Sequence, residues 1–199
     1  MKNNLKIIVP IIIVSFGLLG WFVLGHISKE PKTTSPIIKT AEKIKKEKSQ
    51  PHSISARNAY QIAQSYAKKW AQDAVLVDVS NFISGSNDGL ADLWTFTFRS
   101  PQKGESDGYE VWIADGKFSR EEIGTSTRFL NPVENNWLDS DVIAQKAQEY
   151  FQGLTCKNYW YGLTGNTWKV KCSKEGGGKP KWVELNAVTG EFIKTWEDY

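Results

Sequence analysis

The most apolar stretch of the chain covers residues 7–24 and contains no charged side chain. A helix of this length comes close to crossing the roughly 30 Å hydrocarbon core of a bilayer. The stretch lacks an Ala-x-Ala cleavage site, and no other part of the chain is apolar enough to bury it. The pattern therefore favours a transmembrane signal anchor over a cleaved signal peptide or a buried helix. The short amino-terminal tail is typical of such an anchor, which predicts that the rest of the chain is extracytoplasmic.

Residues 28–52 break the apolar pattern with Lys, Glu, Ser, Thr and three prolines. This composition is typical of a linker. Isoleucines and lysines alternate within 37–48, so a short basic amphipathic helix on an anionic membrane is the alternative. A solvated spacer is favoured, because so short an isolated helix is only marginally stable in water.

Beyond the linker, apolar residues first recur with the spacing of a helix and then with the alternation of strands, and this order occurs twice. Residues 53–72 place apolar side chains three or four apart behind Ser53 or Ser55 as the helix cap. A second such helix covers residues 138–153, with Asp139 or Ser140 as its cap. Strand-like alternation predicts strands at residues 74–83, 93–99, 109–114, 117–123, 156–161, 167–173, 182–186 and 191–196.

The predicted fold class is α+β. We expect an N-terminal transmembrane helix and a linker, followed by two repeats that each pack a helix on an antiparallel sheet. The predicted domains are residues 1–27 for the tail and anchor, 28–52 for the linker, 53–132 for the first repeat and 133–199 for the second.

Charge is distributed unevenly along the chain. The net charge is +3, but residues 1–52 carry nine lysines and three glutamates, which leaves a net charge of −3 on the remainder. A mildly acidic folded region argues against nucleic acid as the ligand.

The carboxy-terminal sequence WVELNAVTGEFIKTW resembles the signature of the PepSY family, in which a strand ends in an Asp-Ala-x-Thr-Gly-Glu type of turn. Here the turn consists of Asn186, Ala187, Val188, Thr189, Gly190 and Glu191, with Asn where the family more often has Asp. The resemblance implies a cystatin-like, extracytoplasmic, non-catalytic module that binds or restrains peptidases. A membrane anchor before two such repeats is also similar to regulators of cell-wall elongation, which bind a membrane-anchored penicillin-binding protein.

The same turn has a purely structural interpretation. Gly190 can adopt the positive φ of a tight hairpin, and the short side chains of Asn186 and Thr189 can hydrogen-bond to the turn backbone. This interpretation is favoured over a ligand site.

The residues for common catalytic and metal sites are missing from the repeats. The two histidines, His26 and His52, both precede them, which argues against a catalytic triad or a histidine-ligated metal. No phosphate-binding glycine motif occurs. Asp139 and Asp141 are better explained as charges at a helix start than as an acid/base pair. We therefore expect no enzyme activity, no metal and no cofactor, while an enzyme that uses only carboxylates stays open.

Cys156 and Cys172 are the only cysteines. If the intervening hairpin turns through residues 162–166, Cys156 lies opposite Cys172 and Trp160 opposite Trp168. The sequence therefore predicts a cross-strand disulfide, which would form outside the cytosol. Two reduced cysteines used as small apolar side chains are the alternative.

Tryptophan is unusually abundant, and two of the nine fall on the polar face of their strands. Trp182 shares a face with Glu184, away from Val183 and Leu185, and Trp112 alternates away from its apolar neighbours. Trp112, Trp182 and Glu184 are therefore candidate partner-binding residues, with packing between the two repeats as the alternative.

Two functions follow from these patterns. The chain is expected to be a membrane-bound extracytoplasmic module that binds and modulates an envelope protein, either a peptidase or a cell-wall synthesis enzyme. Alternatively, the exposed tryptophans bind wall glycan or peptidoglycan directly.

Overall fold

A computed structural model describes residues 52–82 and 85–198. These residues belong to one compact unit, residues 47–199. Its helices are α1 (Ala56–Trp70) and α2 (Ser140–Gln148). Its strands are β1 (Val75–Asn81), β2 (Leu93–Ser100), β3 (Gly104–Ala114), β4 (Lys117–Thr125), β5 (Cys156–Thr164), β6 (Thr167–Lys174), β7 (Lys181–Asn186) and β8 (Phe192–Glu197).

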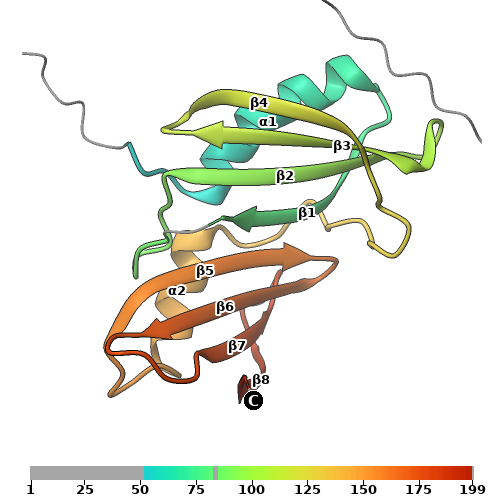
Figure 1. The fold of residues 1–199 in the computed structure, drawn as a ribbon. Coiled ribbons are helices and arrows are strands. Elements are labelled where there is room, and N and C mark those ends of the chain that lie inside the picture. Colours follow the sequence, from blue (N-terminus) through green and yellow to red (C-terminus); the bar gives the residue numbers. More distant parts are fainter. Residues whose placement is uncertain (1–51, 83–84, 199) are drawn as a thin grey trace, which may run out of the picture. The chain divides into compact units, whose positions relative to one another are not determined.

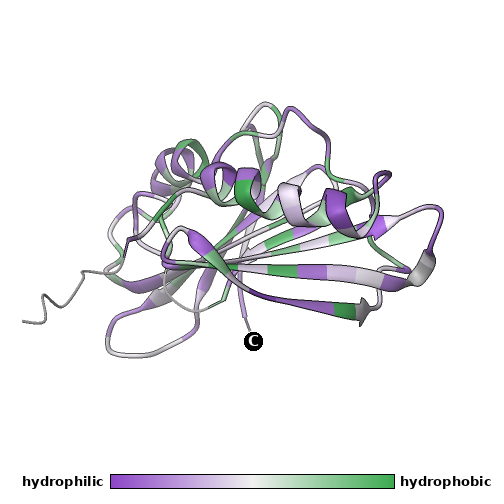
Figure 2. Cartoon of the chain, turned by 90° about the horizontal axis from the view of Figure 1, so that it is seen from above, coloured by the Kyte–Doolittle hydropathy of each residue, from purple (hydrophilic) through white to green (hydrophobic). Residues whose placement is uncertain are grey.

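The predicted fold class is wrong. All eight strands form a single antiparallel sheet in the order β4-β3-β2-β1-β5-β6-β7-β8, so two separate helix-plus-sheet repeats do not exist (Figure 1). The two predicted sheets are merged by the antiparallel pairing of β1 with β5. This sheet-rich layer has both helices on one side, as the view from above shows (Figure 2).

The transmembrane prediction also receives no support from the structure. Residues 7–24 lie outside the described residues. Among the residues that are described, no helix is long and apolar enough to cross a membrane.

The sheet buries one face against the helices because its strands alternate as the sequence predicts. Trp94, Phe96 and Phe98 of β2 point into the core. The inner stripe of α1 consists of Ala56, Ala59, Ala63 and Ala67, all fully buried. These small side chains let α1 lie close to the sheet, while its larger apolar residues Ile62, Tyr66 and Trp70 are only partly buried.

The two helices begin side by side and share their caps. Ser55 caps α1 and Asp139 caps α2, each one of the two residues predicted. Asp139 Oδ1 also accepts from the backbone N–H of Arg57 at 2.9 Å, and Ser140 Oγ accepts from that of Ala56 at 2.9 Å. One carboxylate thus serves the amino-terminal ends of both helix dipoles, which supports the interpretation of Asp139 as a helix-start charge.

The predicted disulfide between Cys156 and Cys172 is present. The predicted hairpin register is wrong, since Trp160 lies opposite Lys171, and Trp168 lies opposite Leu163. The turn has only two residues between Thr164 and Thr167, and a register shift after Cys156 brings its sulfur to Cys172. Trp160 and Trp168 therefore lie on opposite faces of the sheet, because an odd shift in register exchanges the two faces.

Candidate functional site

The sheet face opposite the helices, here called the open face, carries both candidate tryptophans. Val183 and Leu185 are fully buried in the core, and Trp182 and Glu184 alternate to the open face, as predicted. Trp112 likewise alternates away from the buried Val111 and Ile113.

Trp182 is the centre of three packed indoles, here called the tryptophan cluster: Trp160, Trp182 and Trp196. Trp182 stacks on Trp196 with ring centroids 5.5 Å apart and planes within 5°, and Trp160 meets Trp182 edge-on at 5.5 Å. All three side chains are partly exposed. Trp160 lies over Gly162, where a Cβ would come within 2.1 Å of the indole, so any side chain at this position would have to displace the Trp160 ring.

Lysines surround the tryptophan cluster. The ammonium of Lys171 lies 5.2 Å from the Trp182 ring centroid, and that of Lys194 lies 5.2 Å from Trp196. Glu184 is nearly buried, and its carboxylate pairs with Lys194 at 3.4 Å and Lys169 at 3.8 Å. Glu184 therefore positions the lysines of this surface, and its charge is already compensated within the chain.

Trp112 lies in a second, smaller group on the other half of the open face. The Arg120 guanidinium lies 3.3 Å from its ring centroid, Phe82 packs 5.4 Å away, and its indole N–H donates to Glu110. Phe82 is itself more than half exposed. Trp112 contacts β3, β4 and Phe82, which directly follows β1. Trp182 contacts β5, β6, β8 and Asp198, which directly follows β8. Packing between the two halves therefore does not explain either side chain.

The structure thus brings Trp182 and Glu184 together and places Trp112 elsewhere on the same face. Sequence reasoning did not single out Trp160, Trp196 or Phe82 as members of these groups. The sequence did indicate Trp196, which lies two residues after Lys194 and so shares its polar face of β8. For Trp160 this indication was obscured by the wrong hairpin register.

Between these groups lies Asp78, at the middle of the open face. Its cross-strand neighbours are Thr97 and Thr164. Burial and, to a smaller extent, the negative charge of Glu110 together raise the pKa of its carboxyl to about 7, against an opposing effect of Lys169.

Because of this carboxyl, we expect the free energy of unfolding to decrease as the pH rises from about 4 to about 7. The folded protein holds the Asp78 proton across this range, whereas the unfolded chain releases it near pH 3.9. Asp78→Asn should therefore match the parent at pH 4 and exceed its free energy of unfolding by about 1–2 kcal/mol at pH 8. Urea unfolding at both pH values measures the difference, with the exposed Glu122→Gln as the control. An equal offset at both pH values would contradict the assignment.

The turn after β7 has the hydrogen bonds that its sequence predicts. Asn186 Oδ1 accepts from the backbone N–H groups of Val188 and Thr189 at 2.9 and 3.0 Å. Thr189 Oγ1 accepts from the N–H of Glu191 at 3.2 Å, and Gly190 has a φ of 69°. Ala187 is fully buried, and its carbonyl accepts from the N–H of Leu138. These contacts account for the turn as a structural element that fixes the β7–β8 hairpin and docks the segment before α2.

Comparison with known proteins gives a similarity of fold. No protein-family model matches the sequence, so the resemblance to the PepSY family stays a prediction. The search of curated proteins finds no match either. The fold is similar to the crystal structure of a "putative lipoprotein" from Clostridium difficile 630, with a TM-score of 0.51 and 14% sequence identity. The similarity covers 70% of this chain and 92% of the other, and at this identity it establishes a shared fold alone.

Proposed function

We propose that this protein is a non-catalytic, membrane-associated extracytoplasmic module that binds and modulates an envelope protein, either a peptidase or a cell-wall synthesis enzyme. The tryptophan cluster is the observation that carries this proposal. Partly exposed indoles, on a sheet face that no element of the described residues covers, match the enrichment of tryptophan in protein-binding hot spots.

The location outside the cytoplasm is supported by the disulfide, because such bonds persist in oxidising compartments. Association with the membrane is supported by the fold shared with the "putative lipoprotein" of Clostridium difficile. The choice of a peptidase or a wall synthase as the target rests on the resemblance to the PepSY family.

Direct binding of wall glycan is the second candidate, since exposed tryptophans also bind sugars. A sugar ring packs on a free indole face, whereas here the rings of Trp182 and Trp112 already have close neighbours. Trp182 stacks on Trp196 and has Lys171 5.2 Å from its centroid, and Trp112 contacts both Arg120 and Phe82. The geometry therefore supports a protein partner better than a glycan.

Crosslinking on intact cells, followed by mass spectrometry of the captured proteins, tests the proposal. We expect the parent chain to enrich one envelope peptidase or wall synthase, and Trp182→Ala to reduce its recovery at least tenfold, because a hot-spot residue contributes about 1.4 kcal/mol or more. Trp112→Ala reports whether the second group takes part. Phe118→Ala is the matched control, because Phe118 is an exposed aromatic of β4 on the helix side.

Equal recovery of the same protein by the parent and Trp182→Ala would remove the tryptophan cluster from the binding surface. Recovery of wall fragments in place of a protein, with co-sedimentation of the purified chain and wall material, would establish the glycan alternative.

A further inference from the structure

The two outer edges of the sheet differ in how well they are protected from pairing with another strand. The edge of β4 is disturbed in two ways. It carries the charged run Arg120, Glu121 and Glu122, and its pairing with β3 has two register shifts. Such charges and bulges are the usual protection of an edge strand. In β8, Phe192 and Ile193 are 42% and 47% exposed, and its pairing with β7 shifts only once, before Lys194. The edge of β8 is therefore the better template for an added strand.

The sequence of β8 is complementary to itself in antiparallel orientation. When two copies pair around Thr195, each Lys194 lies opposite Trp196 of the second copy, and the two threonines face each other. Each Ile193 then lies opposite Glu197 of the second copy, and no two like charges are opposed. Within one chain, Lys194 already lies over the Trp196 ring, so both side chains point to the open face in the orientation that this pairing uses. Lysine–tryptophan and threonine–threonine pairs are favourable across antiparallel strands.

We propose that two copies of this chain pair through β8, antiparallel and centred on Thr195, into one continuous sheet. The interface is isologous, so it closes as a dimer and does not propagate. Residues 193–197 of each strand take part, five residues over a length of about 17 Å.

The pairing has a consequence for the open face. Trp196 is the outermost member of the tryptophan cluster, and across the dimer axis it meets Lys194 of the second copy. The two tryptophan clusters then form one surface that spans both copies. This dimer does not depend on the proposed function, because it rests on the edge strand and not on any envelope partner.

Light scattering and crosslinking of the full-length chain in mild detergent test the pairing. Cys156 and Cys172 are bonded to each other, so Thr195→Cys introduces the only free thiol. A short bis-maleimide should join two copies of this variant, because directly opposed residues have Cβ atoms about 5 Å apart. Ser119→Cys, on the exposed edge of β4, is the matched control and should stay unlinked.

A pair of substitutions tests the register. Ile193→Asp places an aspartate opposite Glu197 of the second copy and should raise the dimer dissociation constant at least tenfold. Adding Glu197→Lys should restore dimerisation. A chain that stays monomeric up to about 200 µM, or one that crosslinks at position 119 and not at 195, would overturn the proposal. A dimer that Ile193→Asp leaves unchanged would overturn it as well.

Discussion

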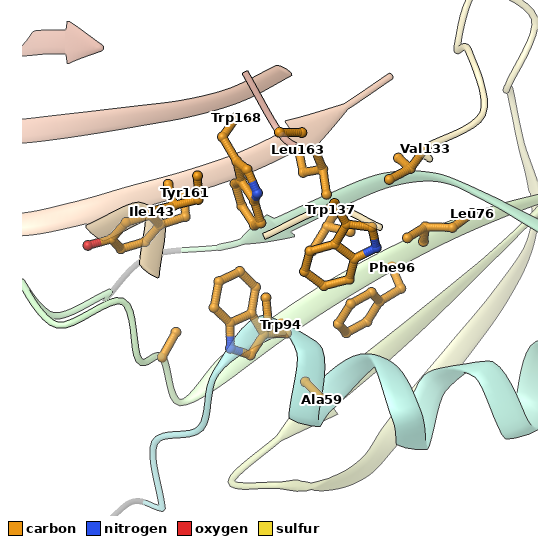
Figure 3. Close-up of a cluster of buried hydrophobic side chains, with 14 of the residues drawn as sticks. Ala59, Leu76, Trp94, Phe96, Val133, Trp137, Ile143, Tyr161, Leu163 and Trp168 are labelled. Carbon is orange, nitrogen blue, oxygen red and sulfur yellow. The ribbon is translucent and has the colours of Figure 1, made fainter. Parts of the chain in front are cut away.

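Replacing Trp137 by alanine is expected to lower the free energy of unfolding by about 3–5 kcal/mol, the range for removing a large buried aromatic. Trp137 is almost completely buried in the segment before α2. Its ring meets Trp168 and Tyr60 edge-on at 5.9 Å, and the Arg57 guanidinium lies 4.0 Å from its centroid. Figure 3 shows the ring between Trp168 on one side and Phe96 on the other. One side chain therefore joins α1 and strands from both halves of the sheet.

Guanidinium unfolding of residues 47–199, followed by circular dichroism, measures this loss. Trp137→Phe keeps a ring in the cavity and should cost less than half as much. The exposed aromatic Phe129 provides the control, since Phe129→Ala removes a side chain that is 89% exposed and should change stability by less than about 0.5 kcal/mol. A loss below 1 kcal/mol in Trp137→Ala would show that the two halves are held together elsewhere.

The second large effect is expected at Asn81, at the end of β1. Direct pairing of β1 with β5 involves only Asp78, Val79 and Ser80. Beyond these residues the Asn81 side chain extends the β1–β5 pairing. Its Nδ2 donates to the Tyr159 carbonyl at 3.1 Å, and its Oδ1 accepts from the Tyr161 N–H at 2.5 Å. Asn81 is fully buried, so its loss leaves the Tyr161 N–H without an acceptor.

Asn81→Ala should therefore destabilise the folded unit by about 2–4 kcal/mol. Asn81→Asp should destabilise it further above pH 5, because the carboxylate cannot donate to the Tyr159 carbonyl and is buried as a charge. Hydrogen exchange at the Tyr161 amide, together with the unfolding midpoint, measures both effects. Asn87→Ala, at an exposed asparagine, is the matched control. An unchanged hydrogen-exchange rate at the Tyr161 amide would contradict a role of Asn81 in holding β1 to β5.

Several features of the candidate surface were accessible to sequence reasoning because they depend on strand alternation alone. The alternation of Trp182 and Glu184 with Val183 and Leu185 assigns faces without any knowledge of the neighbouring strands. The composition of the tryptophan cluster was not accessible in this way. Trp160, Trp182 and Trp196 come from three strands, and their contact depends on the registers of three successive strand pairs, β5–β6, β6–β7 and β7–β8.

The β5–β6 hairpin shows that a small error in register assigns a side chain to the wrong face of the sheet. The cysteine pair was predicted, although the register that suggested it was wrong. A turn shorter than expected placed Trp160 on the open face and Trp168 in the core. The register shift after Cys156 then restored the cysteine contact. Periodicity specifies which residues share a face of one strand, but turn length and bulges decide what lies opposite them.

The sequence by itself determined the order of helices and strands, two candidates for each helix cap, the hydrogen bonds of the turn at Asn186, and the cysteine pair. Each depends on side chains and backbone within one element or one hairpin. Only the tertiary structure decided that eight strands form one sheet, because the β1–β5 pairing joins segments about 80 residues apart through three residue pairs and the side chain of Asn81. No local period encodes such a contact, since its stability comes from burying both strands against a core that exists only after the helices have packed.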